Sequence, residues 1–326
     1  VDAKQLQDVV VVGYLTQNRQ EVTGSVATLS GREAQKAPVA TIGEGIQGRL
    51  PGVQVVNSGI PGQAPVVNIR GLGTLNGDSG PLYIIDGLWV DNIRDFNPAD
   101  AESIQVLKDG ASLAPYGSRG ANGVIIITTK KGKNGAPAIN FNVYAGPQKI
   151  NNTYDLMNAQ QWAVINRQAY ENAGRPVQPF VANPNGVDTD WQKEFIKTGS
   201  VQDYNLSFAG SGPNSNFLLS GEYFNQQGTT IGPKFERYSL RLNSGFTRGR
   251  LRVGENLQLA RTDQTLLNGV PFNDILRMLP IIPVYDPTKS GGFGYGDNNA
   301  STFGTNPIAL QKLLNNTRTN NRIQGN

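Results

Sequence analysis

The chain has 326 residues, including 39 Gly and 19 Pro, and it contains no Cys and no His. Without those two residue types it cannot build a Ser-His-Asp or Cys-His relay, a zinc finger or a disulfide. We predict no enzymatic activity, no cofactor and no metal-ligating site residues, and the sequence leaves a bound metal open. Its 29 basic and 25 acidic residues are spread along the chain without the clustered stripe that phosphate contacts need, so we expect no nucleic-acid partner.

The first element is a continuous β-prone run close to the start of the chain, Val9–Val12. An unpaired run of this kind is an aggregation hazard, so it requires a sheet edge. Pairing within its own fold is the default expectation. Addition as a strand to the sheet of a partner protein is the functional alternative.

The segment that follows, up to about residue 130, has mixed character. Asn97 followed by Pro98 predicts a helix start, because Asn caps well and Pro suits the first turn. Ile104–Leu107 favours a strand over a continued helix. Short β-branched runs bounded by Gly, Pro or Asn predict further buried strands at Val53–Val56, Val66–Ile69, Leu82–Ile85 and Val124–Thr129.

Two motifs in this segment suggest chemistry that we reject. Gly43–Gly48 matches the dinucleotide pattern G-x-G-x-x-G, but no convincing strand precedes it and no acidic residue about 20 positions later could hold a ribose. We predict a short helix or turn there. A group of acidic residues fits neither a calcium loop nor a glycosidase pair, and we assign it to turns and helix starts: Asp86, Asp91, Asp95, Asp100 and Glu102.

The composition changes in the polar run from Lys130 to Pro137, which predicts a domain junction. Beyond it, stretches of about ten residues have one apolar and one polar face, as strands do between lipid and a wet interior. Glu255 falls on the apolar side and requires a bulge or an interfacial position. We predict strands at residues 139–146, 201–210, 216–226, 236–246 and 250–261, with a sixth beginning near Arg318.

The lengths of the connections give a second signal. The short stretches, residues 211–215 and 247–249, fall on one side of the sheet and all longer ones on the other, as in transmembrane barrels. The first long connection carries apolar residues at helical spacing and predicts a helix over residues 158–173. Periodicity alone leaves an ordinary half-buried sheet equally open.

The size of the first domain indicates how many strands a barrel around it would need. A globule of about 100 residues has a radius of gyration near 13 Å, whereas a barrel of about eight strands is already filled by its own side chains. If the first domain sits inside the strands, we expect the sequence to hold only the opening part of a much larger barrel.

Ordered motifs cover essentially the whole chain. They are QDVVVVGY (7–14), IQGRLPGV (46–53), NIRG (68–71), PLYIIDG (81–87), the run from Glu102 to Gly132, LRMLPIIPVYDP (276–287) and NPIALQKL (306–313). Together they resemble the SusC/RagA family of TonB-linked outer-membrane transporters of Bacteroidota.

The resemblance implies an α+β plug domain inside a transmembrane antiparallel β-barrel of 22 strands, of which about six are present here. On this basis residues 1–20 are a TonB-box region and linker, residues 21–135 the plug, and residues 136–326 the first part of the barrel with long extracellular loops. The family's implied activity is import of oligosaccharides or oligopeptides across the outer membrane. The implied partners are TonB, a SusD-like surface lipoprotein that forms a lid, the cargo and outer-membrane lipid.

The resemblance also implies two groups of contact residues. The TonB-interacting segment is Asp8, Val9, Val10, Val11, Val12, Gly13 and Tyr14. We place cargo contacts on outward plug loops, lumen-facing strand residues and loop aromatics: Asn57, Ser58, Gln63, Thr74, Asn76, Asp78, Arg237, Arg241, Phe293 and Tyr295.

A different class of function stays open from the residues themselves. The Gly, Asn and aromatic content also fits a surface glycan-binding protein that does not transport. Detergent dependence and membrane fractionation distinguish the two hypotheses, because only the transporter must span the membrane.

Overall fold

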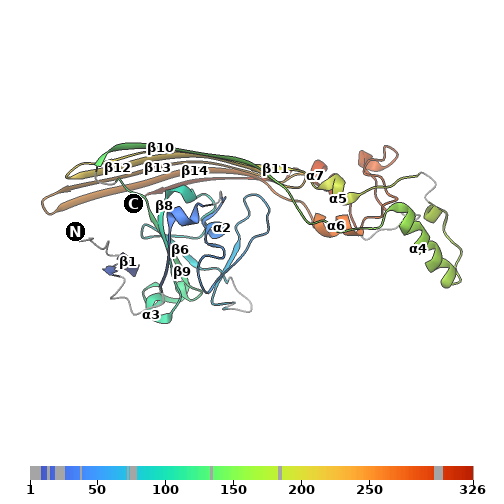
Figure 1. Cartoon of the computed structure of the whole chain (residues 1–326), viewed down its shortest axis with the longest axis horizontal. Helices are drawn as coiled ribbons and strands as arrows, with labels where there is room; N and C mark the ends of the chain where they lie inside the picture. The colour runs from blue at the N-terminus through green and yellow to red at the C-terminus, as the bar shows by residue number, and fades with distance from the viewer. Residues whose placement is uncertain are drawn as a thin grey trace, which may run out of the picture.

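The protein consists of an N-terminal domain, a long antiparallel sheet, and a group of loops and short helices at one end of that sheet (Figure 1). None of the described helices is long and apolar enough to cross a membrane. The computed structural model describes residues 9–12, 15–18, 26–36, 39–71, 73, 79–132, 135–182, 186–296 and 304–325.

The N-terminal domain is built on a five-stranded sheet. β6 and β9 are parallel and the other neighbours are antiparallel. The β-branched run of β9 is buried along nearly its whole length, as expected for a central strand covered on both faces. In spatial order the strands are β3 (Val26–Ser30), β8 (Ala101–Leu107), β9 (Val124–Thr129), β6 (Leu82–Ile85) and β7 (Leu88–Val90).

The turn between β6 and β7 consists of Asp86 and Gly87. Both residues have positive φ, 46° and 87°, and the flanking Ile85 and Leu88 pair with each other. Asp-Gly with two positive φ angles is the signature of a type I′ hairpin turn. The backbone of this turn therefore determines the direction in which the Asp86 side chain leaves the sheet.

Short elements cover this sheet. Thr41 caps α2 (Ile42–Ile46) by accepting from Glu44 N, so the glycine-rich motif is a short helix, as predicted. Asn97 caps the 3-10 helix η2 through Ala99 N, which also confirms the predicted start. The remaining elements are α1 (Gly31–Ala34), the hairpin β4 (Val53–Val56) and β5 (Val66–Ile69), η2 (Pro98–Asp100), α3 (Gly110–Leu113) and η3 (Ala114–Gly120).

The interior of the N-terminal domain is apolar. Ile42, Ile104, Ile125 and Ile127 are fully buried in one cluster, which also includes residues from α2, β4, β5 and β8. A smaller cluster around Leu107 lies on the other face of the sheet. The domain therefore has a core of its own.

The N-terminal valine run forms a hairpin. β1 (Val9–Val12) pairs antiparallel with β2 (Leu15–Asn18), from Val9 opposite Asn18 to Val12 opposite Leu15. The expectation that this run pairs within its own chain is confirmed. The hairpin lies on the side of the N-terminal domain away from the loops and short helices (Figure 1).

The long sheet has six strands in sequence order, all antiparallel. All six predicted strands are confirmed, and each of the first five is a few residues longer than predicted. The register between β13 and β14 is continuous through Ser244 opposite Glu255, so of the two predicted alternatives the bulge is excluded. Glu255 is exposed and lies towards the end of the sheet that carries the short turn at residues 249–250. The strands are β10 (Gly135–Gln148), β11 (Gly199–Ser211), β12 (Ser215–Gln227), β13 (Lys234–Arg248), β14 (Leu251–Thr265) and β15 (Thr317–Gly325).

One face of the long sheet exposes apolar side chains, such as Phe141, Leu206 and Leu240. Near the loop end this face carries a row of tyrosines, Tyr204, Tyr223 and Tyr238, whose neighbouring ring centroids are 6.2 and 5.0 Å apart. From Tyr238 to Phe246, near the opposite end, the strand spans roughly 27 Å at about 3.4 Å per residue. These dimensions match the apolar band of a lipid-facing wall, which is about 25 Å tall between aromatic girdles.

The connections are sorted by length, as predicted. The short turns, residues 212–214 and 249–250, lie at one end of the sheet, and the connections over residues 149–198 and 266–316 lie at the other. The long connections share an apolar core that includes Trp191, Phe195 and Ile308. They contain α4 (Ala159–Asn172), η4 (Pro179–Ala182), α5 (Trp191–Phe195), α6 (Pro271–Arg277), η5 (Ser290–Gly292) and α7 (Pro307–Leu313).

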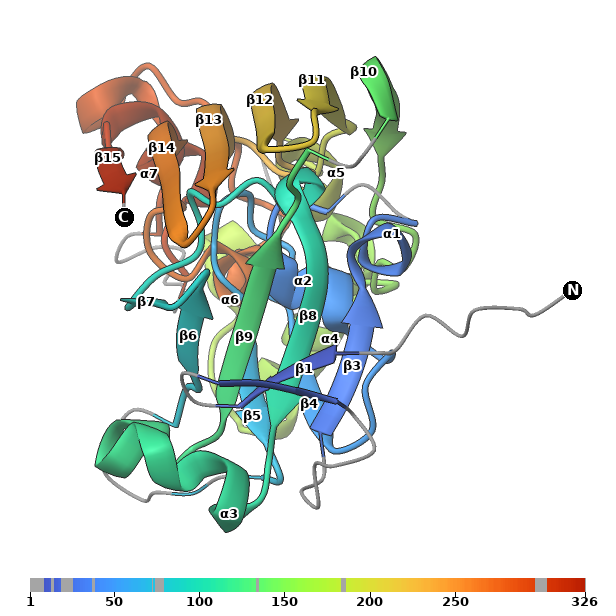
Figure 2. The ribbon, with the colours of Figure 1, turned by 90° about the vertical axis from the view of Figure 1, so that its left-hand side faces the viewer.

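The N-terminal domain lies against the face of the long sheet opposite the exposed apolar one. Viewed end-on, the six strands form an arc above the domain (Figure 2). We refer to the contact between the two as the seam.

Candidate functional site

The seam is polar on both sides. The strand side chains that face the N-terminal domain alternate with the exposed apolar ones, so the period of two sends them all inward. The apolar part of the seam is a small cluster in which Ala40 meets Val201, Phe224 and Phe235. The buried polar residues on the sheet side are Ser220, Glu222, Arg237, Arg241, Asn243, Gln258, Thr262 and Gln264.

Arg237 on β13 is the most deeply buried charge of the seam, with 0% of its side chain exposed. It donates two hydrogen bonds of 2.7 Å to the carboxylate of Glu222 on β12. Its third nitrogen, Nη1, donates to the backbone carbonyls of Ala40 at 2.6 Å and Arg94 at 3.0 Å in the N-terminal domain. A sheet arginine therefore holds two separate loops of that domain.

Asp86, in the type I′ turn, forms the first of two ion pairs across the seam. Arg241 Nη2 lies 3.4 Å from Asp86 Oδ2, and Asn256 on β14 donates to the same oxygen. Within the domain, Thr129 N donates to Asp86 Oδ1 at 2.9 Å. One carboxylate therefore joins the β6–β7 turn, β9 and two strands of the long sheet.

Asp95 forms the second ion pair, with Arg322 Nε on β15 at 2.6 Å from its Oδ2. Gln258 connects the two pairs, because it accepts from Arg241 Nη1 at 3.2 Å and donates to the carbonyl of Asp95 at 3.0 Å. Burial raises the pKa of Asp95 above its ordinary value, although the charge of Arg322 opposes this shift. Its Oδ1 is buried without a hydrogen-bond partner among the described residues.

A third contact involves Asp100 at the end of η2. Ser220 Oγ donates to Asp100 Oδ1 at 2.7 Å, and both side chains are buried. Burial raises the pKa of Asp100, and this is opposed by the nearby charge of Arg241 and by the Ser220 hydrogen bond. Burial likewise raises the pKa of Glu44, which accepts from Ala40 N at 3.0 Å.

This composition determines how the seam can open. A buried apolar interface loses its hydrophobic stabilisation when separated, whereas water can replace hydrogen bonds of the kind that dominate here. The N-terminal domain has an apolar core made of its own residues, separate from the seam. The arrangement therefore suits a domain that moves away from the sheet while staying folded.

Two of the predicted cargo residues, Arg237 and Arg241, lie in the seam. We predicted that both face the inside of the sheet and bind cargo. Their side chains do face inward, but they are only 0% and 2% exposed because the N-terminal domain covers them. Their nitrogens bind Glu222, Gln258, Asp86 and the domain's carbonyls, so cargo does not reach them in this arrangement.

The predicted loop residues Asn57, Ser58 and Gln63 are exposed, on the loop between β4 and β5. Ser58 Oγ donates to Gln63 Oε1 at 2.9 Å, and Gly59 N donates to Asn57 Oδ1 at 3.0 Å, so the three side chains also shape their own loop. Pro61, in the same loop, accepts from Gln264 near the loop end of β14 at 2.8 Å. The loop therefore lies towards the end of the sheet that carries the long connections.

Phe293 and Tyr295 lie in the long connection between β14 and β15. Phe293 packs on Tyr285 with ring centroids 5.3 Å apart, and Lys289 Nζ lies 5.0 Å from the Tyr295 ring centre. Several other predicted site residues lie outside the described residues: Thr74, Asn76, Asp78, Asp8, Gly13 and Tyr14.

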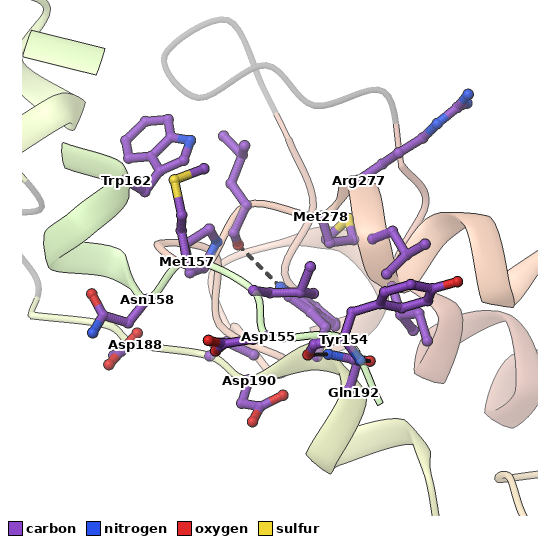
Figure 3. A pocket seen from close by; sticks show the side chains of 17 residues that line it. Tyr154, Asp155, Met157, Asn158, Trp162, Asp188, Asp190, Gln192, Arg277 and Met278 are labelled. Atoms are coloured by element: carbon purple, nitrogen blue, oxygen red, sulfur yellow. Dashed lines mark hydrogen bonds between the residues drawn. The ribbon is translucent and has the colours of Figure 1, made fainter. Parts of the chain in front are cut away.

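The long connections enclose a cavity of about 370 Å³ (Figure 3). It lies between residues 154–158, 188–192 and 275–280. Asp188 and Asp190 at its edge accept from the first-turn amides of α4 and α5, Ala159 N at 2.8 Å and Lys193 N at 3.0 Å. The cavity is within the size range of small-ligand sites, and among the residues that the structure describes none of the predicted cargo contacts lines it.

Sequence reasoning assigned Asp86, Asp95 and Asp100 to turns and helix starts. This was correct for their backbones but missed that their carboxylates reach the long sheet. The available signal was the inward-facing Arg241 on a predicted strand, because a buried arginine requires an acidic partner.

Comparisons with known proteins agree with this arrangement. A family model described as "TonB-dependent Receptor Plug Domain" matches residues 18–124. TonB-dependent receptor P3 of Formosa agariphila is 38% identical over 323 residues, which cover 95% of this chain and 31% of that protein. TonB-dependent receptor SusC of Bacteroides thetaiotaomicron is 31% identical over 357 residues, which cover 100% of this chain and 35% of that protein.

Among solved structures, the RagAB peptide importer in its "open-open" state is similar, with a TM-score of 0.75 and 29% sequence identity. The match covers 92% of this chain and 38% of that one. The chain thus spans about a third of the length of the curated relatives it matches.

Proposed function

Because the chain belongs to the SusC/RagA-like TonB-dependent receptors, we propose that its N-terminal domain is the plug of an outer-membrane importer and its long sheet part of the barrel wall. In this proposal the plug closes the barrel at rest. Import then requires the plug, or part of it, to move away from the wall without unfolding completely.

The polar seam is the observation that carries this proposal. Arg237, Asp86 and Asp95 hold the plug through ion pairs and hydrogen bonds, which water can replace one at a time. The plug's apolar core supports a unit that stays intact during the movement. A plug fixed by an apolar interface would have to expose that surface at every transport cycle, at about 25 cal/mol per Å².

We assign the driving contact to the segment around β1. A strand exposes main-chain donors and acceptors along its edge, and a partner can add to that edge. β1 is paired with β2 along one edge, and it lies on the plug side opposite the long loops. This position supports access by TonB from the periplasmic side, with the residues from Asp8 to Tyr14 as the contact.

We assign cargo capture to the opposite end. The exposed plug loop with Asn57, Ser58 and Gln63 and the connections that carry Phe293 and Tyr295 both face that end. Oligosaccharides or oligopeptides are the proposed cargo, with a SusD-like lipoprotein as a lid over the loops. RagAB is a peptide importer, which favours peptides by analogy only.

The experiment replaces Val10 and Val12 by Pro in the full-length receptor. Each Pro removes a main-chain donor from β1 and disfavours the strand pairing that TonB requires. We expect uptake of labelled cargo by cells to fall to the level of a strain without TonB, while cargo binding to outer-membrane fractions stays unchanged.

The matched control is Val10→Thr with Val12→Thr, which keeps both donors and β-branching. It should import at close to the wild-type rate. Normal uptake by the proline variant would contradict the proposed role of this segment.

A further inference from the structure

A second, much smaller cavity lies in the seam, between its two ion pairs. Its volume is about 10 Å³, and it is lined by Ile85, Leu88, Arg241, Asn256, Gln258 and Gln324. Arg241 and Asn256 bind Asp86, the acid of the first pair. Gln258 and Gln324 contact the second pair, through the carbonyl of Asp95 and through Arg322.

One of the lining residues, Arg241, has a nitrogen without a hydrogen-bond acceptor among the described residues. Its Nη1 donates to Gln258 and its Nη2 to Asp86, but its Nε is buried with no accepting atom among the residues that the structure describes. The side chain is 2% exposed, so bulk solvent does not satisfy the nitrogen. A buried donor on a charged group that stays unsatisfied costs about 1–3 kcal/mol or more.

Two lining residues also have side-chain oxygens that can accept hydrogen bonds from a bound molecule. Asn256 commits its amide nitrogen to Asp86, which leaves its carbonyl oxygen for another donor. Gln324 receives only a long bond of 3.5 Å from Arg322. One water needs a volume of at least about 10–15 Å³ and two to four polar partners, whereas purely apolar cavities stay dry.

We propose that this cavity is a binding site for a single water molecule, which accepts from Arg241 Nε and donates to the side-chain oxygens of Asn256 and Gln324. The water joins the two ion pairs into one hydrogen-bonded unit across the plug and the wall. Because the site follows from the seam alone, it holds or fails independently of the proposed import function.

The first test is a crystal structure of the full-length receptor at a resolution that resolves ordered waters. We expect one solvent peak within about 2.7–3.2 Å of Arg241 Nε. An empty cavity, or a side chain from another part of the barrel in its place, would overturn the proposal. So would an anomalous peak there after a bromide soak, because it would identify an anion site.

The second test fills the cavity by Leu88→Phe, with Leu88→Ile as a control of unchanged volume. Expulsion of the water leaves Arg241 Nε unsatisfied, so we expect amide hydrogen exchange of residues 85–88 to accelerate roughly tenfold. The Ile variant should stay within about twofold of wild type.

If the Phe variant does not fold, Gln324→Met removes one partner of the water without enlarging the plug. It should weaken or abolish the solvent peak, whereas Gln226→Leu, on β12 and outside the cavity lining, should leave it in place. An unchanged peak in Gln324→Met would contradict the assigned hydrogen bonding.

Discussion

Asp86 combines two roles in one residue. Its backbone, at φ 46°, is the first position of the type I′ turn between β6 and β7. Its carboxylate leaves that turn and binds Arg241 and Asn256 on the wall. The two roles depend on different properties, since Asn suits this turn as well as Asp does, whereas only Asp carries the charge that Arg241 requires.

We therefore predict that Asp86→Asn preserves the plug fold and weakens the seam. Arg241 remains buried without its counter-ion, and breaking a buried pair in this way costs about 3–5 kcal/mol. Amide exchange of residues 82–90 in the full-length receptor should accelerate, and far-UV circular dichroism should stay unchanged.

The matched control is Asp91→Asn in the plug's exposed ion pair with Arg119, where the Asp91 side chain is 91% exposed. An exposed pair contributes about 0–1 kcal/mol, so its exchange should stay close to wild type. Equal effects of the two variants would show that burial of the Asp86 pair is unimportant.

Asp100 gives the seam a dependence on pH. Burial raises the pKa of Asp100, so the closed plug binds this proton more tightly than the unfolded chain does. The resulting stabilisation is fully present below about pH 4, the ordinary value for Asp, and is lost as pH rises through the raised pKa. Asp95 and Glu44 contribute with the same sign.

We predict that the free energy of plug opening falls over this window and that Asp100→Asn removes part of the fall, because the amide has no proton to lose there. The measurement is amide exchange of residues 98–105 at several pH values, corrected for the intrinsic pH dependence of exchange. Identical slopes for wild type and variant would rule out Asp100 as a contributor.

At the scale of elements, the loop between β4 and β5 docks on the wall by close approach. A Cβ on Gly62 would lie 2.3 Å from Phe235 Cδ2 and 3.0 Å from Gln264 Nε2. Gly59, in the same loop, has the same left-handed backbone, with φ 72° against 70°, and open space around the position of its Cβ. Comparing alanine substitutions at Gly62 and Gly59 therefore separates the cost of backbone strain from the cost of the packing clash.

We predict that Gly62→Ala displaces the loop and Gly59→Ala does not. Both variants carry a similar cost for alanine at positive φ, about 1–2 kcal/mol, and the Gly62 variant adds an overpacking cost of about 1–3 kcal/mol. Exchange of the loop amides should accelerate more in Gly62→Ala. Indistinguishable variants would mean that the loop does not depend on this contact.

The elements that could be predicted from sequence are those with an internal pattern. Strands such as β11 and β13 alternate two faces over ten or more residues, so their position and orientation follow from the residues themselves. β3 and β7 were not predicted. They are short, and their strand state depends on pairing with β8 and β6, which the sequence does not display locally.

The site could be predicted only in part, for a related reason. The alternation correctly turned Arg237 inward, but it contains no information on what covers that face. The partner atoms, the carbonyls of Ala40 and Arg94, lie more than 140 positions earlier in the chain. Backbone carbonyls have no residue signature, so this contact could not be inferred from residue types.

At the scale of the whole molecule, plug and wall are two units joined by a polar seam. Ser220 Oγ on the wall lies 2.7 Å from Asp100 Oδ1 on the plug. These 326 residues contain no Cys, so no native thiol among them competes with an introduced pair. A cysteine pair at these positions therefore offers a reversible bond between the two units.

We predict that Asp100→Cys with Ser220→Cys, once oxidised, binds cargo but does not import it, because the plug cannot separate from the wall. Reduction by dithiothreitol should restore uptake, and each single variant should import under both conditions. Uptake by fully cross-linked protein, as judged on a non-reducing gel, would contradict movement of the plug at this contact.

In the proposed membrane arrangement, the row formed by Tyr204, Tyr223 and Tyr238 marks the level of the lipid headgroups on the side of the long connections. Tyrosine rings settle at the level of lipid headgroups, and β13 begins at Lys234, so its strand rises roughly 14 Å past that level at about 3.4 Å per residue. The helices α4 to α7 lie beyond this end of the sheet (Figure 1). The apolar core that α5, α6 and α7 share is therefore held clear of the proposed bilayer, and these connections meet the external medium first.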